Sequence, residues 1–214
     1  MHFDENNIYH ICNRGNNGEA IFVNHDNFLH FLWQMRKYLL PYGQLICYCL
    51  MMNHYHWQFL VERTAISLIE LQAHATRVEN LRRTVQYGPK AILKAVPITG
   101  KDKLIALGES IGILQRSYAN AFNRATDRTG NLFQHQYHAE KGFIDRFLTV
   151  DDPYYAQTRD YPFTCFHYIT DNARKAGMVK SNTDYLYSSA RDYAGLRNGT
   201  ICNLELGWEL LRNF

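Results

Sequence analysis

The stretch from residue 53 to 59, Asn-His-Tyr-His-Trp-Gln-Phe, places the strongest constraint on how this chain folds. Aromatic residues dominate it and neither glycine nor proline interrupts it, so we predict a buried β-strand. Successive side chains of a strand point to opposite faces, which puts His54 and His56 on the same face. Two adjacent imidazoles could supply two ligands to a divalent metal, or could be hydrogen-bonded histidines in an aromatic core. The motif alone does not decide between the two.

The pattern around this stretch predicts an α+β fold. Residues 8–13 and 44–50 are expected to form strands, and residues 24–40 between them carry apolar side chains with the period of a helix that Asn24 would cap. With a strand over 55–62, this order opens a ferredoxin-like (RRM-like) fold, an antiparallel sheet with helices on one face. The other expected elements are helices over 67–84 and 104–124, a fourth strand over 131–140, and a helical stretch from about Pro153 to Ala176, broken near Tyr161 and capped by Gly177.

The length of 214 residues suits one domain with an elaboration, or at most two small domains. We expect a domain over 1–189, a helical insertion at about 85–103 where Gly, Pro and Lys gather, and a C-terminal extension over 190–214. The apolar residues of the extension fit a helix and a strand equally well. A net charge of +3 is compatible with nucleic-acid binding but does not require it.

Cysteine usage and hydropathy indicate where the protein works. Five cysteines without a CxxC pair, together with no signal peptide, favour a reducing compartment. No apolar run is long enough to span a membrane, so no membrane partner is expected. The expected location is cytoplasmic and nucleoid-associated.

A second candidate for chemistry lies in the last long helical stretch. Tyr168 and Asn172 are four residues apart, so on a helix they share one face. A phenol beside an amide that can bind a metal is a suitable arrangement for phosphoryl transfer, in which the tyrosine attacks a phosphate. Other tyrosines in the region, at 154, 155 and 161, are equally eligible by composition.

Several short motifs occur along the chain in a characteristic order. They are Tyr9-His10, Asn13-Arg14-Gly15-Asn16-Asn17, Ile21-Phe22, Asn53-His54-Tyr55-His56-Trp57, Arg128-Thr129-Gly130-Asn131-Leu132-Phe133-Gln134, Tyr168-Ile169 with Asn172 and Ala176-Gly177, and Asp184-Tyr185-Leu186-Tyr187-Ser188-Ser189. In this order they resemble the single-tyrosine HUH transposases, in particular the REP-associated tyrosine transposases and their insertion-sequence TnpA relatives. The resemblance spans roughly residues 8 to 189.

The resemblance implies the HUH endonuclease fold and a metal-dependent activity on single-stranded DNA. His54, His56 and Asn172 would bind Mg²⁺ or Mn²⁺, and Tyr168 would be the catalytic nucleophile. In that family the tyrosine attacks a DNA phosphate, forms a 5′-phosphotyrosine intermediate and releases a 3′-OH, commonly at hairpin or repeat sequences. Many members are homodimers, although REP-associated members can be monomers.

The chain departs from the family pattern at several places, including longer segments over 85–103 and 157–164. The helix motif lacks the usual proline after Asn172, and His135-Gln136-Tyr137 replaces a common Gly-Arg-aromatic sequence. These changes affect the expected DNA-reading periphery and leave the expected catalytic set intact. The DNA-binding candidates are Arg14, Arg116, Arg124, Arg128, Lys141, Arg174 and Lys175.

Two other functions compete with the transposase reading. One is a noncatalytic RRM-like nucleic-acid-binding module, which would not need both histidines, Tyr168 and Asn172 together. The other is a metallohydrolase with a His-x-His-x-Asp motif, in which Gln58 occupies the position of the aspartate ligand.

Overall fold

The computed structural model describes residues 2–93, 102–141 and 161–212. It contains two compact units, each assembled from separate stretches of chain. The first unit comprises residues 1–5, 24–43 and 62–130, and the second comprises residues 6–23, 44–61 and 131–214. The expected domain over 1–189 and extension over 190–214 stay a prediction. No helix in the described ranges is both long enough and apolar enough to cross a membrane.

The first unit is built from three helices and a small sheet. Asn24 caps the first helix as predicted, since its side chain accepts a hydrogen bond from the Asn27 N–H at 3.0 Å. The elements are α1 (His25–Tyr38), η2 (Leu40–Tyr42), β4 (Ala65–Ser67), α2 (Leu68–Tyr87), η3 (Pro89–Ala91), β5 (Leu104–Ala106) and α3 (Leu107–Ala125). The expected insertion over 85–103 includes the end of α2 and η3, while residues 94–101 lie outside the described residues.

The prediction of a helix from residue 104 is wrong for its first three residues. These residues form β5, which pairs antiparallel with β4 and places Ile105 opposite Ile66. Both isoleucines are buried, at 1% and 3% exposure, and the strand pairing satisfies their backbone groups. The helix begins at Leu107, where the backbone N–H bonds to the Thr64 carbonyl at 2.8 Å. Tertiary pairing therefore overrides the helical period at this end.

The second unit contains a four-stranded sheet in the order β2-β3-β1-β6. Its strands are β1 (Asn7–Arg14), β2 (Gly43–Met51), β3 (His54–Val61) and β6 (His138–Lys141). β1 runs antiparallel to both of its neighbours, so the first strand lies between the third and the last. This sheet, together with the order of strands and helices along the chain, confirms the predicted ferredoxin-like α+β class.

The predicted fourth strand is shorter than expected. Only residues 138–141 form β6, while Phe133 makes an isolated bridge to Gly15 and the Gln134 N–H bonds to the Arg14 carbonyl. The intervening residues leave the ladder, although their sequence alternates as a strand would. The alternation of apolar and polar residues identifies the buried face of a strand, but it does not show at which residue the pairing with the neighbouring strand stops.

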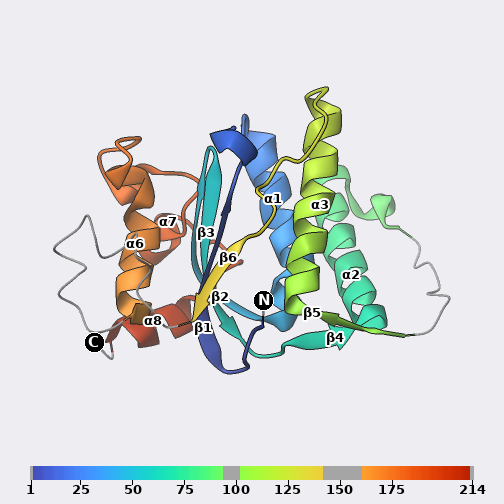
Figure 1. Ribbon diagram of the computed structural model, residues 1–214, viewed down its shortest axis with the longest axis horizontal. Helices are drawn as coiled ribbons and strands as arrows, with labels where there is room; N and C mark the ends of the chain where they lie inside the picture. The colour runs from blue at the N-terminus through green and yellow to red at the C-terminus, as the bar shows by residue number, and fades with distance from the viewer. Residues whose placement is uncertain (1, 94–101, 142–160, 213–214) are drawn as a thin grey trace. The chain divides into compact units, whose positions relative to one another are not determined.

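Helix α6 (Tyr161–Lys175) packs against β3 and beside α8 (Leu204–Arg212), as Figure 1 shows. The first part of the predicted helical stretch, before residue 161, lies outside the described residues. The predicted cap is confirmed, because Gly177 has a positive φ of 70° and the Met178 N–H bonds to the Ala173 carbonyl at 3.0 Å. In the C-terminal segment the apolar residues fitted a helix and a strand equally well, and residues 204–212 form helix α8. This helix buries Leu210 in the same apolar cluster as residues of α6.

A buried ion pair organises the chain between α7 (Ala190–Tyr193) and α8. Arg197 donates from Nε to Asp192 Oδ1 at 2.7 Å and from Nη2 to Oδ2 at 2.6 Å. The same guanidinium reaches the Tyr48 hydroxyl at 3.0 Å and the Ser188 carbonyl at 2.8 Å. The Asp192 side chain is only 1% exposed. The pair therefore connects the C-terminal segment to strand β2 of the sheet.

Candidate active site

The face of β3 that packs toward α6 carries the two histidines of the central motif. The His54 and His56 rings lie edge to face with their centroids 5.0 Å apart. The antiparallel register places Arg14 of β1 opposite His54 and Cys12 opposite His56. Because side chains alternate along each strand, all four project from the same face of the sheet.

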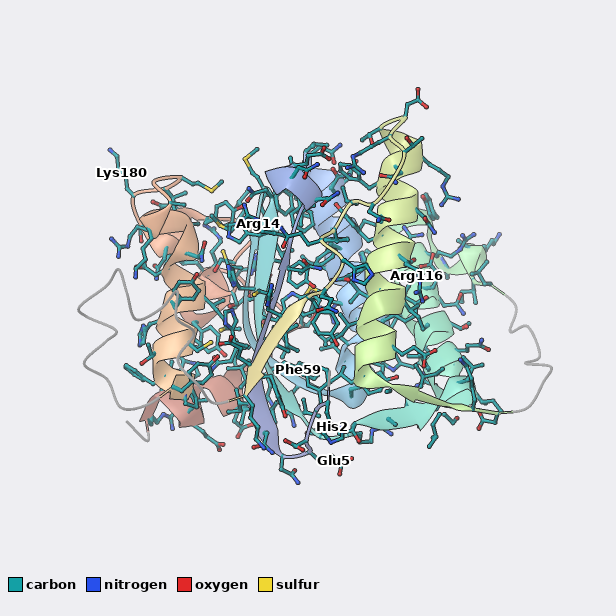
Figure 2. The ribbon with its side chains drawn as sticks, in the orientation of Figure 1. His2, Glu5, Arg14, Phe59, Arg116 and Lys180 are labelled. Atoms are coloured by element: carbon teal, nitrogen blue, oxygen red, sulfur yellow. The ribbon has the colours of Figure 1, made fainter. Side chains whose placement is uncertain are left out.

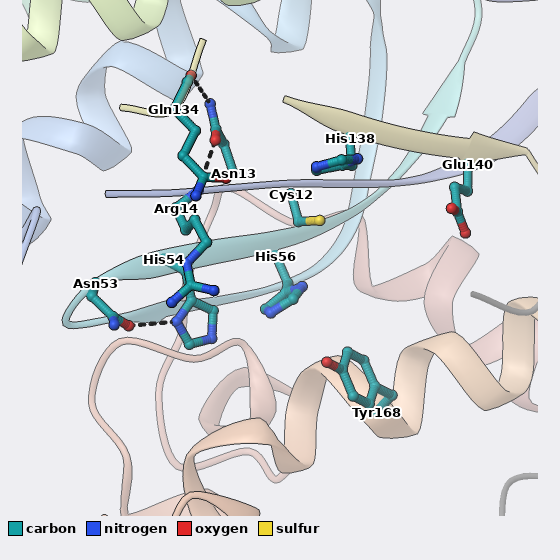
Figure 3. A pocket seen from close by; sticks show the side chains of 10 residues that line it. All are labelled: Cys12, Asn13, Arg14, Asn53, His54, His56, Gln134, His138, Glu140 and Tyr168. Atoms are coloured by element: carbon teal, nitrogen blue, oxygen red, sulfur yellow. Dashed lines mark hydrogen bonds between the residues drawn. The ribbon is translucent and has the colours of Figure 1, made fainter. Parts of the chain in front are cut away.

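Helix α6 brings a phenol to this face. The Tyr168 ring centroid lies 5.4 Å from that of His56, and the rings are nearly perpendicular. Figure 3 shows the Tyr168 hydroxyl directed from the helix toward the imidazoles. One turn later, the Asn172 side chain makes a hydrogen bond with His54. The structure thus brings together the four residues expected to form the catalytic set, from β3 and α6.

The start of α6 is attached to β3 by a buried amide. Gln58 is fully buried, and its Nε2 donates to the Pro162 carbonyl at 2.7 Å. Its Oε1 accepts a weaker hydrogen bond from the Cys47 thiol at 3.5 Å. Both ends of this amide are occupied by protein groups, so Gln58 does not act as the third ligand of a His-x-His-x-Asp site. It instead sets the position of the helix that carries Tyr168.

A cavity of about 450 Å³ opens between β1, β3, β6 and α6. Figure 3 shows the imidazoles and the phenol facing into it. The lining residues are Cys12, Asn13, Arg14, Asn53, His54, His56, Gln134, His138, Glu140 and Tyr168. This combination of imidazoles, a phenol and a guanidinium around one hollow suits a phosphate-containing ligand.

Burial keeps both histidines of the pair neutral. The pKa of His56 is lowered well below its usual value, first by burial and then by the neighbouring charges that His10 and His54 would carry. Burial also lowers the pKa of His54, with a further contribution from Arg14, while its hydrogen bond to Asn172 acts in the opposite direction. Neutral imidazoles have a free lone pair, which metal coordination requires.

The lowered pKa values predict that acid destabilises the fold. Below pH 6.5 the unfolded chain protonates these two imidazoles more readily than the folded chain does, so the stabilisation is lost as the pH falls. Between pH 7.5 and 5.5 we expect the free energy of unfolding to drop, by at most roughly 1.4 kcal/mol for each imidazole. Urea unfolding at the two pH values measures this, and His56→Asn should reduce the difference. The exposed His135 provides the control, and an unchanged pH dependence in His56→Asn would contradict the assignment.

No family model matches the chain, and no curated protein matches it. A solved structure described as a REP-associated tyrosine transposase bound to a REP hairpin aligns with 92% of this chain and 86% of its own, with 14% identity and a TM-score of 0.46. This chain is similar in structure to a REP-associated tyrosine transposase.

The expected DNA-binding residues are distributed between both units. Arg14 is exposed at the end of β1 and lines the cavity (Figure 2). Lys141 ends β6, and Lys175 is exposed in the last turn of α6. Arg174 forms a bidentate ion pair with Asp171 in its own helix. The other three, Arg116, Arg124 and Arg128, belong to the first unit, where Arg128 bonds to Asn123.

Among the residues beside the histidine pair, His10 and Cys12 were not identified from the sequence as members of the site. His10 lies on β1 with its ring stacked on His56 at 5.1 Å between centroids and 6.0 Å from the Tyr168 ring. Cys12, two residues on, shares its face. The alternation of Tyr9, His10, Ile11 and Cys12 could have indicated a polar face on this strand. The pairing with His56, however, depends on the strand register.

Proposed function

We propose that this protein is a metal-dependent single-stranded DNA endonuclease and strand transferase with Tyr168 as the nucleophile. The observation that carries the proposal is the approach of Tyr168 to the His54–His56 pair, with Asn172 one helical turn away on His54. The motif order along the sequence supports the same reaction class. The proposed substrates are DNA hairpins or repeat sequences, and the proposed location is the cytoplasm, in association with the nucleoid.

The donor set suits a divalent cation such as Mg²⁺ or Mn²⁺. His54, His56 and Asn172 offer two neutral imidazole nitrogens and an amide oxygen, which leave positions for phosphate oxygens and water. When bound, the ion would withdraw charge from the scissile phosphate. Gln58 supports this arrangement indirectly, because it fixes the start of α6 against β3.

The reaction consists of one exchange of phosphate ester bonds. The Tyr168 oxygen attacks the phosphorus, a tyrosyl–phosphate bond forms, and the bond to the 3′ oxygen breaks. The phenol proton is released to solvent, and the departing 3′ oxygen takes up a proton. Attack of a 3′-OH on the phosphotyrosine reverses the exchange and joins DNA without an external energy source. Arg14, at the cavity, is placed to hold a neighbouring phosphate.

Removal of the metal is expected to abolish adduct formation. Labelled single-stranded hairpins from repeats that flank the gene are incubated with the protein and Mg²⁺ or Mn²⁺, then resolved on a denaturing gel. We expect a covalent protein–DNA band with either ion, none with a chelator, and recovery when the ion is restored. A band of equal intensity in excess chelator would contradict the metal-dependent mechanism.

The second candidate function is a noncatalytic nucleic-acid-binding module on the same sheet. It predicts hairpin binding in a gel-shift assay without any covalent band under all metal conditions. The cavity lined by Arg14, together with the exposed Lys175, fits this function too. The covalent band therefore separates the two functions, whereas the binding measurement does not.

A further inference from the structure

A second group of metal-binding side chains overlaps the His54–His56 pair. The side chains of His10, Cys12 and His56 bring their ligand atoms within 4.8 Å of one another. His10 and His56 are buried, at 3% and 7% exposure, and Cys12 is half-buried. They come from neighbouring antiparallel strands, so the rigid ladder between β1 and β3 fixes their spacing.

The two imidazoles face each other through their nitrogens. His10 Nε2 and His56 Nδ1 are 2.9 Å apart. At this distance two lone pairs repel, so the nitrogens must have either a proton or a cation between them. Zn–N bonds of about 2.0–2.1 Å in a tetrahedron place two nitrogens roughly 3.3 Å apart. A shift of a few tenths of an ångström would therefore convert this hydrogen-bonded pair into two ligands of one ion.

The third member of the group determines the class of cation. Cysteine binds as the thiolate, a soft ligand that favours Zn²⁺ over Mg²⁺ or Mn²⁺. Cys12 lies opposite His56 on one side and opposite His138 of β6 on the other. The exposed His138 also lines the cavity, where water or this fourth side chain can complete the coordination.

We propose that His10, Cys12 and His56 form a second site, specific for a thiophilic divalent cation of the Zn²⁺ class. On binding, the Cys12 thiol loses its proton to solvent, and the proton between the imidazoles moves to the other nitrogen of its own ring, so both imidazoles bind as neutral ligands. Because His56 belongs to both sites, Zn²⁺ here removes one ligand from the His54–His56–Asn172 set. Zn²⁺ would then inhibit the DNA reaction, and this consequence alone rests on the function proposed above.

Binding is tested with Co²⁺ as a spectroscopic substitute for Zn²⁺. The full-length protein is titrated with Co²⁺ under reducing conditions, and the near-ultraviolet thiolate-to-cobalt charge-transfer band is recorded. We expect one equivalent of Co²⁺ to produce the band and one equivalent of Zn²⁺ to remove it. Cys12→Ser should lose the band and bind Zn²⁺ at least about tenfold more weakly. The half-buried Cys202, outside the cavity, supplies the control Cys202→Ser, which should keep the band.

Two further variants locate the ion. His10→Ala should weaken Zn²⁺ binding as Cys12→Ser does, whereas His54→Ala should retain the charge-transfer band. Circular dichroism verifies that each variant is folded. A charge-transfer band that persists in Cys12→Ser, or Zn²⁺ binding that depends on His54 and not on His10, would overturn the proposal.

Inhibition is measured separately, so that the two proposals can fail independently. Adduct formation at fixed Mg²⁺ is followed as Zn²⁺ is raised, and each variant is normalised to its own rate without Zn²⁺. We expect Cys12→Ser to require at least about tenfold more Zn²⁺ for half-inhibition. Cobalt binding without any DNA adduct would reject the proposed function and leave the second site established. A DNA adduct without the charge-transfer band would reject the second site and support the proposed function.

Discussion

The Tyr168→Phe variant is expected to form no covalent adduct with single-stranded DNA, at less than about one thousandth of the unchanged protein's rate. The substitution removes only the hydroxyl, which is the attacking group in the proposed reaction. The ring that packs edge-on against His10 and His56 remains, so the fold and the position of α6 should not change. Denaturing gels measure the adduct, and gel-shift assays should show DNA binding within about twofold of the unchanged protein.

Tyr161→Phe is the matched control on the same helix. Tyr161 is buried, at 5% exposure, in the apolar cluster that α6 forms with β2 and α8. Its hydroxyl therefore has no access to a DNA phosphate, and the variant should form the adduct normally. If Tyr168→Phe forms the adduct and Tyr161→Phe does not, our assignment of the nucleophile is wrong. If both variants form it, the nucleophile is another tyrosine of the chain.

Arg197→Ala is expected to lower the free energy of unfolding by about 3 kcal/mol. The substitution leaves the Asp192 carboxylate, whose side chain is 1% exposed, without its guanidinium partner. It also removes hydrogen bonds to the Tyr48 hydroxyl and the Ser188 carbonyl. The Arg197 side chain itself is 31% exposed, so water can enter and the loss should fall at the lower end of the range for buried pairs.

Urea unfolding followed by circular dichroism measures this loss. The surface pair of Lys103 and Glu109, with side chains 59% and 45% exposed, provides the comparison, and Lys103→Ala should cost less than about 1 kcal/mol. Adding Asp192→Asn to Arg197→Ala should recover part of the stability, because no buried charge remains. Equal losses for Arg197→Ala and Lys103→Ala would show that the buried pair contributes no more than an exposed one.

The local pattern of apolar residues was sufficient to predict the strands and helices in which that pattern is uninterrupted. The strands around residues 8–13, 44–50 and 55–62 and the helix capped by Asn24 all lie within a few residues of their predicted bounds. Where pairing between distant segments decides the structure, the same pattern failed. Leu104 pairs with Ser67 as part of β5, and a helical period cannot reveal that partner.

In the candidate site, too, the sequence predicted local relationships and missed those between distant segments. Spacing alone put His54 and His56 on one face of a strand and Tyr168 and Asn172 on one face of a helix, and the resemblance to a family connected the two pairs. His10 and Cys12 were not predicted from the sequence, because their position beside His56 depends on the register between β1 and β3. The attachment of α6 through Gln58 depends on a contact between residues 104 positions apart. Neither relationship has a local signal in the sequence.

The interleaved construction of the second unit has a consequence during protein synthesis. The unit takes β1, β2 and β3 from residues 6–61 but the helix that carries Tyr168 from beyond residue 131. The ribosome therefore finishes β3, which carries His54 and His56, more than a hundred residues before it adds Tyr168 and Asn172. Nascent or prematurely terminated chains that lack α6 hold the imidazole pair without the phenol. The proposed nicking activity therefore requires that α6 has been synthesised, because a shorter chain lacks Tyr168 and Asn172.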